Sequence, residues 1–333
     1  MLQREEPVED ERGDRDARCE DAEDAAGLPH HTSLPGAGRR RPAAGAIAAT
    51  VREVIDLHTH STCSDGSETP GRVVEHAAAA GCSAVALTDH DTLAGLPEAA
   101  ARAAALGVRL VPGCEVSCAT ATGSMHILCY FIDGSGPLAV QLSSLREDRE
   151  HRNRDLVARL RTLGLPISEE EVLAEAGGSG VGRPHFAAVL VRNGAAASIQ
   201  DAFDRYLAKG RPGYVPKARV EPTEIIESAV ASGGCAVLAH PLSLELEPPD
   251  LERRLAELAA AGLSGMECAY GRYDPATRAV LAATAARLDL VATGGSDYHG
   301  SYKPDLEVGI GRGDLEVPDS ALAELDERRP RTP

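Results

Sequence analysis

The stretch Asp56-Leu57-His58-Thr59-His60-Ser61, with Asp65 in the segment that follows, decides the fold. The apolar run at residues 54–57 predicts a buried strand, and the Ser-Asp-Gly-Ser sequence at 64–67 predicts the loop that leaves it. Successive side chains of a strand point to opposite faces, so His58 and His60 share one face. Two imidazoles directed at one point suit a divalent metal ion, although a His-x-His pair alone also occurs in ordinary cores.

The composition favours a large α/β fold and excludes a broad nucleic-acid surface. The chain has 333 residues, 43% of them hydrophobic, with no Trp and three Phe. Its core must therefore be built mainly from Ala, Val and Leu, which suits helices packed on parallel strands. A formal net charge of -17 argues against a duplex-DNA surface, so an anionic partner must be drawn to a local site.

The cysteines and the apolar runs indicate the compartment. None of the eight cysteines forms a Cys-x-x-Cys pair, which predicts reduced, mostly buried thiols rather than disulfides or zinc ligands. No apolar run approaches the length of a membrane span, and the N-terminus is acidic. We therefore expect a cytoplasmic protein with no membrane partner.

The chain divides into a tail, a barrel and an insertion. Residues 1–50 are rich in mixed charge, Gly, Pro and Arg, which predicts a disordered tail. Strand-like and helix-like runs alternate over 53–137 and 214–312, and polar residues follow successive strands. Six or seven such units imply a parallel sheet closed into a TIM-like α/β barrel with its site at the strand ends. Residues 138–213 lack strand-like runs and predict a helical insertion, and residues 313–333 are expected to form a C-terminal tail.

Nine residues of metal-ligand type lie at or near the ends of these predicted strands. Each alone has an ordinary reading as a turn, cap or core residue, but buried imidazoles and carboxylates without partners are costly. Together they predict a metal site. The nine are His58, His60, Asp65, His90, Glu115, His126, His240, Asp297 and His299.

The motifs that carry these residues resemble the PHP (polymerase and histidinol phosphatase) family over residues 53–312. They are the opening stretch, Leu87-Thr88-Asp89-His90-Asp91, Pro112-Gly113-Cys114-Glu115-Val116, His126, Ala239-His240-Pro241 and Gly295-Ser296-Asp297-Tyr298-His299. Within the insertion, Gly182-Arg183-Pro184-His185 and Lys209-Gly210-Arg211-Pro212 resemble the stand-alone branch. That branch includes nucleoside 3′,5′-bisphosphate phosphatases and a 5′→3′ exoribonuclease that trims RNA 5′ ends.

The resemblance implies a distorted (βα)7 barrel that holds three divalent metal ions, often Mn²⁺ and sometimes Zn²⁺ or Fe²⁺. Glu115 would bridge two of these ions, and the pair would carry the attacking hydroxide, while the third ion would bind a phosphate oxygen. The implied ligand sets are His58, His60, Glu115 and Asp297; Glu115, His126 and His240; and Asp65, His90 and His299.

The same comparison suggests residues that meet the substrate, a nucleotide or an RNA 5′ end. Arg183 is expected to grip a second phosphate with its planar fork. His185 would either give a proton to the leaving oxygen or face solvent. Lys209 and Arg211 are candidates for substrate contact, and Ser61 for orienting a phosphate or a ligand.

Three alternatives stay open. An amidohydrolase also begins with His-x-His, but many of those enzymes use a carbamylated lysine, and none of the three lysines ends a predicted strand. A histidinol-phosphate-type phosphatase of the same family would have a similar site. A metal-binding regulatory module without turnover is the third alternative. The oligomeric state is left open.

Overall fold

The computed structural model describes residues 54–177, 180–216 and 219–330, which belong to one compact unit. The tail expected at 1–50 lies outside the described residues. Seven cysteines fall within them, and all seven are free thiols, as expected. No helix in the described ranges has both the length and the apolar character needed to cross a membrane.

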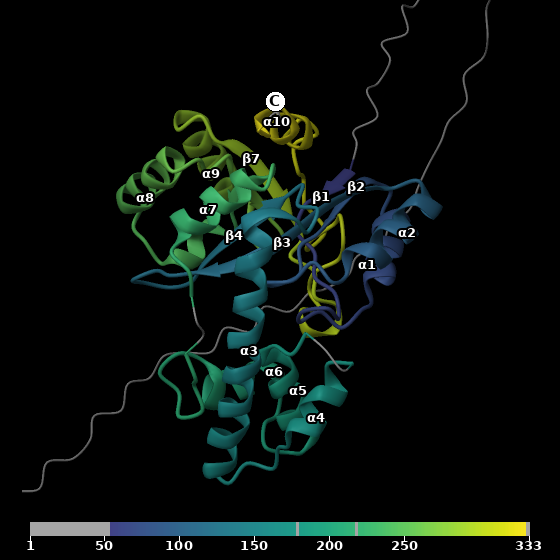
Figure 1. Ribbon diagram of the computed structural model, residues 1–333, viewed down its shortest axis with the longest axis vertical. Helices are drawn as coiled ribbons and strands as arrows, with labels where there is room; N and C mark the ends of the chain where they lie inside the picture. Colours follow the sequence, from purple (N-terminus) through teal and green to yellow (C-terminus); the bar gives the residue numbers. More distant parts are fainter. Residues whose placement is uncertain (1–53, 178–179, 217–218, 331–333) are drawn as a thin grey trace, which may run out of the picture. The chain divides into compact units, whose positions relative to one another are not determined.

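Seven strands follow one another around the barrel in chain order. The expectation of a TIM-like α/β barrel is confirmed (Figure 1). The strands are β1 (Val54–Asp56), β2 (Cys82–Leu87), β3 (Arg109–Cys118), β4 (Met125–Tyr130), β5 (Cys235–Leu238), β6 (Gly265–Tyr270) and β7 (Val291–Gly295).

The expectation of a wholly parallel sheet is wrong at β4. This strand runs antiparallel to both β3 and β5, whereas the other neighbouring pairs are parallel. Residues 119–124 are too short a connection for a crossover, so β3 and β4 form a hairpin. The reversal brings the first residues of β4 to the rim where the other strands end.

The segments after β1 and in β7 close the barrel. The amide of Leu57 donates to the carbonyl of Gly294 at 3.1 Å, and the amide of Asp297 donates to the carbonyl of His58 at 2.8 Å. A Cβ atom on Gly295 would lie 2.4 Å from the Cβ of His58, so only glycine allows this approach. Barrel closure therefore sets the position of the first histidine.

Helices cover the outside of the barrel. Figure 1 shows α1 and α2 on one side and α7, α8 and α9 on the other. Thr69 caps α1 by accepting from the amide of Arg72, and Pro70 occupies its first position. These helices are α1 (Pro70–Ala79), α2 (Leu96–Leu106), α7 (Pro222–Ala231), α8 (Pro248–Ala260) and α9 (Pro275–Arg287).

The described part of the expected C-terminal tail instead contains a packed helix, α10 (Ala321–Arg328). Leu322 and Leu325 are buried in the same apolar cluster as Cys235 and Val291, the first residues of β5 and β7. The helix thus covers the end of the barrel opposite the rim where the strands finish. Its apolar face supplies the burial that a solvated tail lacks.

The insertion is a small helical layer with its own core. It contains α3 (Gly136–Thr162), α4 (Glu169–Glu175), α5 (Arg183–Arg192), α6 (Ile199–Ala202) and the π-helix η1 (Phe203–Leu207). The first half of α3 packs into the barrel cluster through Leu138 and Leu142, and its second half packs into the insertion core through Leu156 and Leu160. One continuous helix therefore joins the two cores (Figure 1).

Candidate metal centre

All nine residues predicted as metal ligands meet at the rim where the parallel strands end. His58 and His60 follow β1, His90 follows β2, and Glu115 lies in the second half of β3. His126 lies at the start of β4, which reaches the same rim only because β4 is antiparallel. The remaining four are Asp65 in the loop after β1, His240 after β5, and Asp297 and His299 after β7.

Glu115 stands at the centre of the cluster and divides it in two. Its Oε2 lies 3.2 Å from Nε2 of His58 and 3.1 Å from Nε2 of His60. Its Oε1 lies 2.8 Å from Nδ1 of His126 and 3.1 Å from Nε2 of His240. A carboxylate whose two oxygens face separate pairs of imidazoles is placed to bridge two cations.

Asp65 and Asp297 complete the cluster on the side of β7. Asp65 Oδ1 lies 3.3 Å from Nε2 of His299, and its Oδ2 lies 3.8 Å from Nε2 of His90. Asp297 Oδ1 lies 3.5 Å and 3.4 Å from the Nε2 atoms of His58 and His60. Ligand atoms lie within 4.8 Å of one another in three groups: His60, Asp65, His90 and His299; His58, His60 and Glu115; and His90, Glu115 and His126.

The donor set fits divalent cations. The Nε2 atoms of His58 and His60 face each other at 3.1 Å, and both side chains are fully buried. At most one proton fits between two such nitrogens, so in the neutral rings a lone pair is left pointing into the cluster. Imidazole and carboxylate ligands together suit Mn, Fe and Zn.

The carboxylates are held in their ionised form. Burial alone would raise the pKa of Glu115, but His90, His126 and His58 outweigh it and hold this pKa well below its usual range. Burial likewise opposes ionisation of Asp65, and His90 and His299 reverse the effect on its pKa. Anionic carboxylates are the form that metal binding requires.

Glu267 of β6 is a buried residue of the site that the sequence analysis missed. Its Oε1 lies 3.0 Å from Nδ1 of His58, and its Oε2 accepts from the backbone amide of His240 at 2.7 Å. Glu267 accepts in both contacts, so a proton of His58 lies on Nδ1, and its Nε2 faces the cluster. The only signal in the sequence was one acidic residue inside the apolar run at 265–269.

Further polar contacts hold the loops around the cluster. Ser61, predicted to orient a phosphate or a ligand, is buried and donates its hydroxyl to Asp89 at 2.6 Å. Asp89 also accepts from the hydroxyl of Ser64 at 2.7 Å, so it fixes the loop after β1. Tyr270 donates its hydroxyl to Asp297 Oδ2 at 2.9 Å, and the ammonium of Lys303 pairs with the same oxygen.

The predicted substrate residues of the insertion lie in different surroundings. Arg183 lines a cavity beside the cluster. His185 is 1% exposed, and its Nδ1 accepts from the backbone amide of Gly182 at 2.9 Å at the start of α5. Burial lowers the pKa of His185. Lys209 and Arg211 are exposed and do not line that cavity, so the predicted substrate contacts of these two residues gain no support.

The cavity beside the cluster has a volume of about 290 Å³ and a cationic wall. Asp65, His90 and His126 border it on the cluster side. Its arginines are Arg149, Arg152, Arg183 and Arg219. A second cavity, of about 560 Å³, shares His90 and Arg149 with it and has apolar walls from the insertion.

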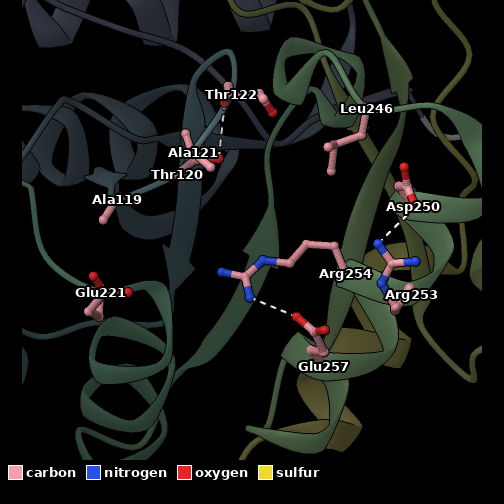
Figure 2. A pocket seen from close by; sticks show the side chains of 10 residues that line it. All are labelled: Ala119, Thr120, Ala121, Thr122, Glu221, Leu246, Asp250, Arg253, Arg254 and Glu257. Atoms are coloured by element: carbon pink, nitrogen blue, oxygen red, sulfur yellow. Dashed lines mark hydrogen bonds and ion pairs between the residues drawn. The ribbon is translucent and has the colours of Figure 1, made fainter.

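Another cavity of about 560 Å³ contains none of the nine cluster residues. Figure 2 shows that its arginines are paired, Arg253 with Asp250 and Arg254 with Glu257, each at 2.8 Å. Hairpin residues 119–122 form its other wall. The paired arginines make this cavity a poor site for a phosphate group.

A TIM-like barrel with imidazoles and carboxylates converging at one rim defines a metal-dependent hydrolase. Comparison with known proteins gives the family. The PHP domain model matches residues 56–210. A 3′,5′-nucleoside bisphosphate phosphatase from Chromobacterium violaceum is 37% identical over 257 residues, which cover 77% of this chain and 90% of that relative. The chain belongs to the PHP family.

Another relative and a solved structure are similar to most of the chain. The 5′-3′ exoribonuclease Rnm from Salmonella typhimurium is 37% identical over 249 residues, covering 74% of this chain and 85% of that protein. A structure from Chromobacterium violaceum, described as an amidohydrolase with bound sulfate and no metal, is 36% identical with a TM-score of 0.75 and covers 84% of this chain and 98% of that one. The chain is accordingly a metal-dependent phosphoric ester hydrolase.

Proposed function

We propose that this chain hydrolyses phosphate esters of nucleotides, acting on a 3′,5′-bisphosphate or on the 5′ end of a short RNA. The observation that carries the proposal is Glu115, whose two oxygens face separate pairs of imidazoles beside an arginine-lined cavity. The similarity to a nucleoside bisphosphate phosphatase and to an exoribonuclease points to the same substrates.

The cluster would hold three divalent ions, with Mn²⁺ as the first choice and Zn²⁺ or Fe²⁺ as alternatives. Bound ions of this kind lower the pKa of coordinated water from 15.7 to about 7 and neutralise charge on a phosphoryl group. The proposed ligand sets are His58, His60, Glu115 and Asp297; Glu115, His126 and His240; and Asp65, His90 and His299.

The chain's own groups prepare the site for this chemistry. Glu267 keeps a proton on Nδ1 of His58, which leaves Nε2 free to face the centre. Asp89 holds the Ser61 and Ser64 hydroxyls and thereby the loop that carries Asp65. His58 and the loop that carries Asp65 are therefore oriented before substrate arrives, which limits reorganisation during the reaction.

The insertion at 138–213 would cap the site and supply cationic contacts. Arg149 and Arg152 of α3 and Arg183 at the start of α5 line the cavity that borders Asp65 and His90. Arg183 stacks over Tyr214 at 5.2 Å, which fixes its guanidinium plane. The sulfate bound in the related Chromobacterium violaceum structure is an oxyanion of the same shape as phosphate and agrees with an anion site in this family.

A histidinol-phosphate-type phosphatase is the second candidate, since its metal cluster would look alike. A turnover assay with Mn²⁺ that compares adenosine 3′,5′-bisphosphate, a short 5′-phosphorylated RNA and histidinol phosphate separates the candidates. We expect the nucleotide or the RNA to be hydrolysed with the highest kcat/KM. Preference for histidinol phosphate would contradict the proposal.

Glu115→Ala tests the assignment of the cluster. The variant removes the one carboxylate of the described residues that faces both imidazole pairs, so turnover should be lost and the bound metal content should fall. Glu224→Ala, an exposed acidic residue on α7, is the matched control and should keep wild-type turnover. Near-wild-type activity of Glu115→Ala with metal present would refute the assignment.

A further inference from the structure

Arg152 is a buried guanidinium with few partners. It lies on α3, is 7% exposed, and borders the cavity beside the cluster. One NH₂ group donates to the side chain of Asn153 at 2.7 Å, while its Nε is buried without a hydrogen-bond partner in the described part of the chain. Among the described residues no carboxylate forms an ion pair with it. Burying a charged group that has no ion pair lowers the stability of the folded protein.

Its nearest charged neighbours make the position still less favourable. Burial, together with repulsion from Arg183 and Arg149, lowers the pKa of Arg152 to about 9. Arg149 is neutralised by its ion pair with Asp91, whereas Arg183 lies against the ring of Tyr214 and forms no ion pair with a carboxylate in the described part of the chain. The side chain stays protonated at neutral pH, so the fold carries here a buried positive charge that has no ion pair among the described residues.

The charged residues that line the cavity are mostly cationic. Among the residues that the structure describes, four arginines border it, and the one carboxylate in its wall, Asp65, belongs to the metal cluster. The same cavity therefore has a hydrolytic end at Asp65, His90 and His126 and a cationic end at the arginines. A volume of about 290 Å³ leaves room for a small molecule that reaches both ends.

We propose that Arg152, acting with Arg183 and Arg219, binds a second phosphate group of the substrate whose first phosphate occupies the cluster. This inference rests on the proposed function and makes Arg152 a specificity residue for it. Guanidinium groups bind phosphate through paired, charge-assisted hydrogen bonds, and the phosphate in turn offsets the cost of burying Arg152.

The site discriminates among substrates of the same reaction. A ribose that carries two phosphates satisfies both ends of the cavity, whether the second is a 3′-phosphate or the next phosphodiester of an RNA. A monophosphate leaves the arginines without an anion. A substrate with an ammonium group, such as histidinol phosphate, places a positive charge against the arginine wall and is repelled.

The test compares full-length wild-type protein and Arg152→Gln, both with Mn²⁺. The doubly phosphorylated substrates are adenosine 3′,5′-bisphosphate and the 5′-phosphorylated dinucleotide pApA. The singly phosphorylated substrates are adenosine 3′-monophosphate and adenosine 5′-monophosphate. We expect the ratio of kcat/KM for doubly to singly phosphorylated substrates to fall about 10- to 100-fold, mainly through KM, as for a lost hydrogen bond to a charged group. A loss with the bisphosphate alone identifies a site for a terminal phosphate, and a loss with pApA alone identifies a site for a phosphodiester.

A binding measurement separates this inference from the proposed function. Calorimetric titration of EDTA-treated full-length protein with adenosine 3′,5′-bisphosphate should show weaker binding to Arg152→Gln and partial recovery in Arg152→Lys. Arg161→Gln, an exposed arginine of the same helix, is the control and should bind like wild type. An unchanged substrate ratio with unchanged affinity overturns the inference. Absence of turnover in wild type with Mn²⁺ overturns the proposed function, while the affinity difference still decides the role of Arg152.

Discussion

Glu267 holds two residues of the cluster at once. It accepts from Nδ1 of His58 and from the backbone amide of His240, and it is fully buried. In Glu267→Gln one oxygen becomes an NH₂ group, which can only face another donor, so one of the two contacts is lost. We expect metal affinity or kcat to fall about 10- to 100-fold, as measured by activity against metal concentration.

Two variants make this prediction specific. Glu257→Gln changes an exposed residue of α8 in the same chemical way and should leave metal affinity and kcat as in wild type. In Glu267→Gln, excess Mn²⁺ should recover part of the activity if the loss arises from metal affinity. Wild-type metal content together with wild-type kcat in this variant would show that His58 is oriented by other contacts.

At the residue scale, the sequence reveals ligands that follow the end of an apolar run and conceals site residues that lie inside a strand or among the charges of a helix. His58 and His60 are visible because two imidazoles directly follow a short apolar strand. Glu267 lies inside such a strand, and Arg152 lies among other arginines of a charged helix. Only tertiary packing distinguishes a buried arginine from a solvated one, so Arg152 could not have been predicted.

Helix α3 links the barrel and the insertion, and two valines on it allow a matched comparison. Val157 is 7% exposed and belongs to the insertion core, whereas Val140 is 73% exposed near the barrel. Val157→Ala should lower the free energy of unfolding by about 2 kcal/mol, because buried methyl groups are lost and a cavity remains. Val140→Ala should change it by less than about 0.5 kcal/mol.

Denaturant titration of both variants measures the difference. Arg152 and Arg149 project from the same helix, so Val157→Ala should also raise KM for a bisphosphate more than Val140→Ala does. Equal free energies of unfolding for the two variants would mean that the second half of α3 does not stabilise the insertion.

At the element scale, apolar periodicity gave the strands and helices, but it carries no information on strand direction. The run at 125–131 has the apolar pattern of the other strands, and the short connection at 119–124 accounts for its reversal. The segment after residue 312 has only three apolar positions on α10 that are buried, Ala321, Leu322 and Leu325. A pattern this short cannot be distinguished from a charged tail in the sequence. It becomes recognisable as a helix only when the end of the barrel on which it packs is known.

At the scale of the whole molecule, charge is separated between the surface and the site. The chain carries a net charge of -17, yet the cavity beside the cluster is lined by four arginines. Long polyanions are repelled by the acidic surface, while a small anion or a chain end can enter the cavity. The contrast agrees with small phosphorylated substrates rather than duplex nucleic acid.

The cluster also links nearly all strands of the barrel, so removal of the metal should lower the stability of the whole barrel. Its side chains come from or directly follow every strand except β6, and β6 contributes Glu267. A metal ion that binds only the folded state stabilises it by about 4 kcal/mol at a thousandfold excess over Kd, which corresponds to a Tm shift of about 10 °C for a domain of this size. We therefore expect EDTA to lower Tm by that amount and Mn²⁺ to restore it.

Differential scanning calorimetry with stepwise Mn²⁺ measures this shift, and Glu115→Ala is the decisive comparison. The variant keeps most of the imidazoles but lacks the carboxylate that faces both pairs, so its Tm should rise much less with Mn²⁺. Mg²⁺ is a further control, because it prefers oxygen ligands and should stabilise this histidine-rich cluster less. A wild-type Tm that does not respond to EDTA or Mn²⁺ would mean that the imidazoles and carboxylates hold the barrel closed by their own contacts, and the proposed metal centre would then lose its physical basis.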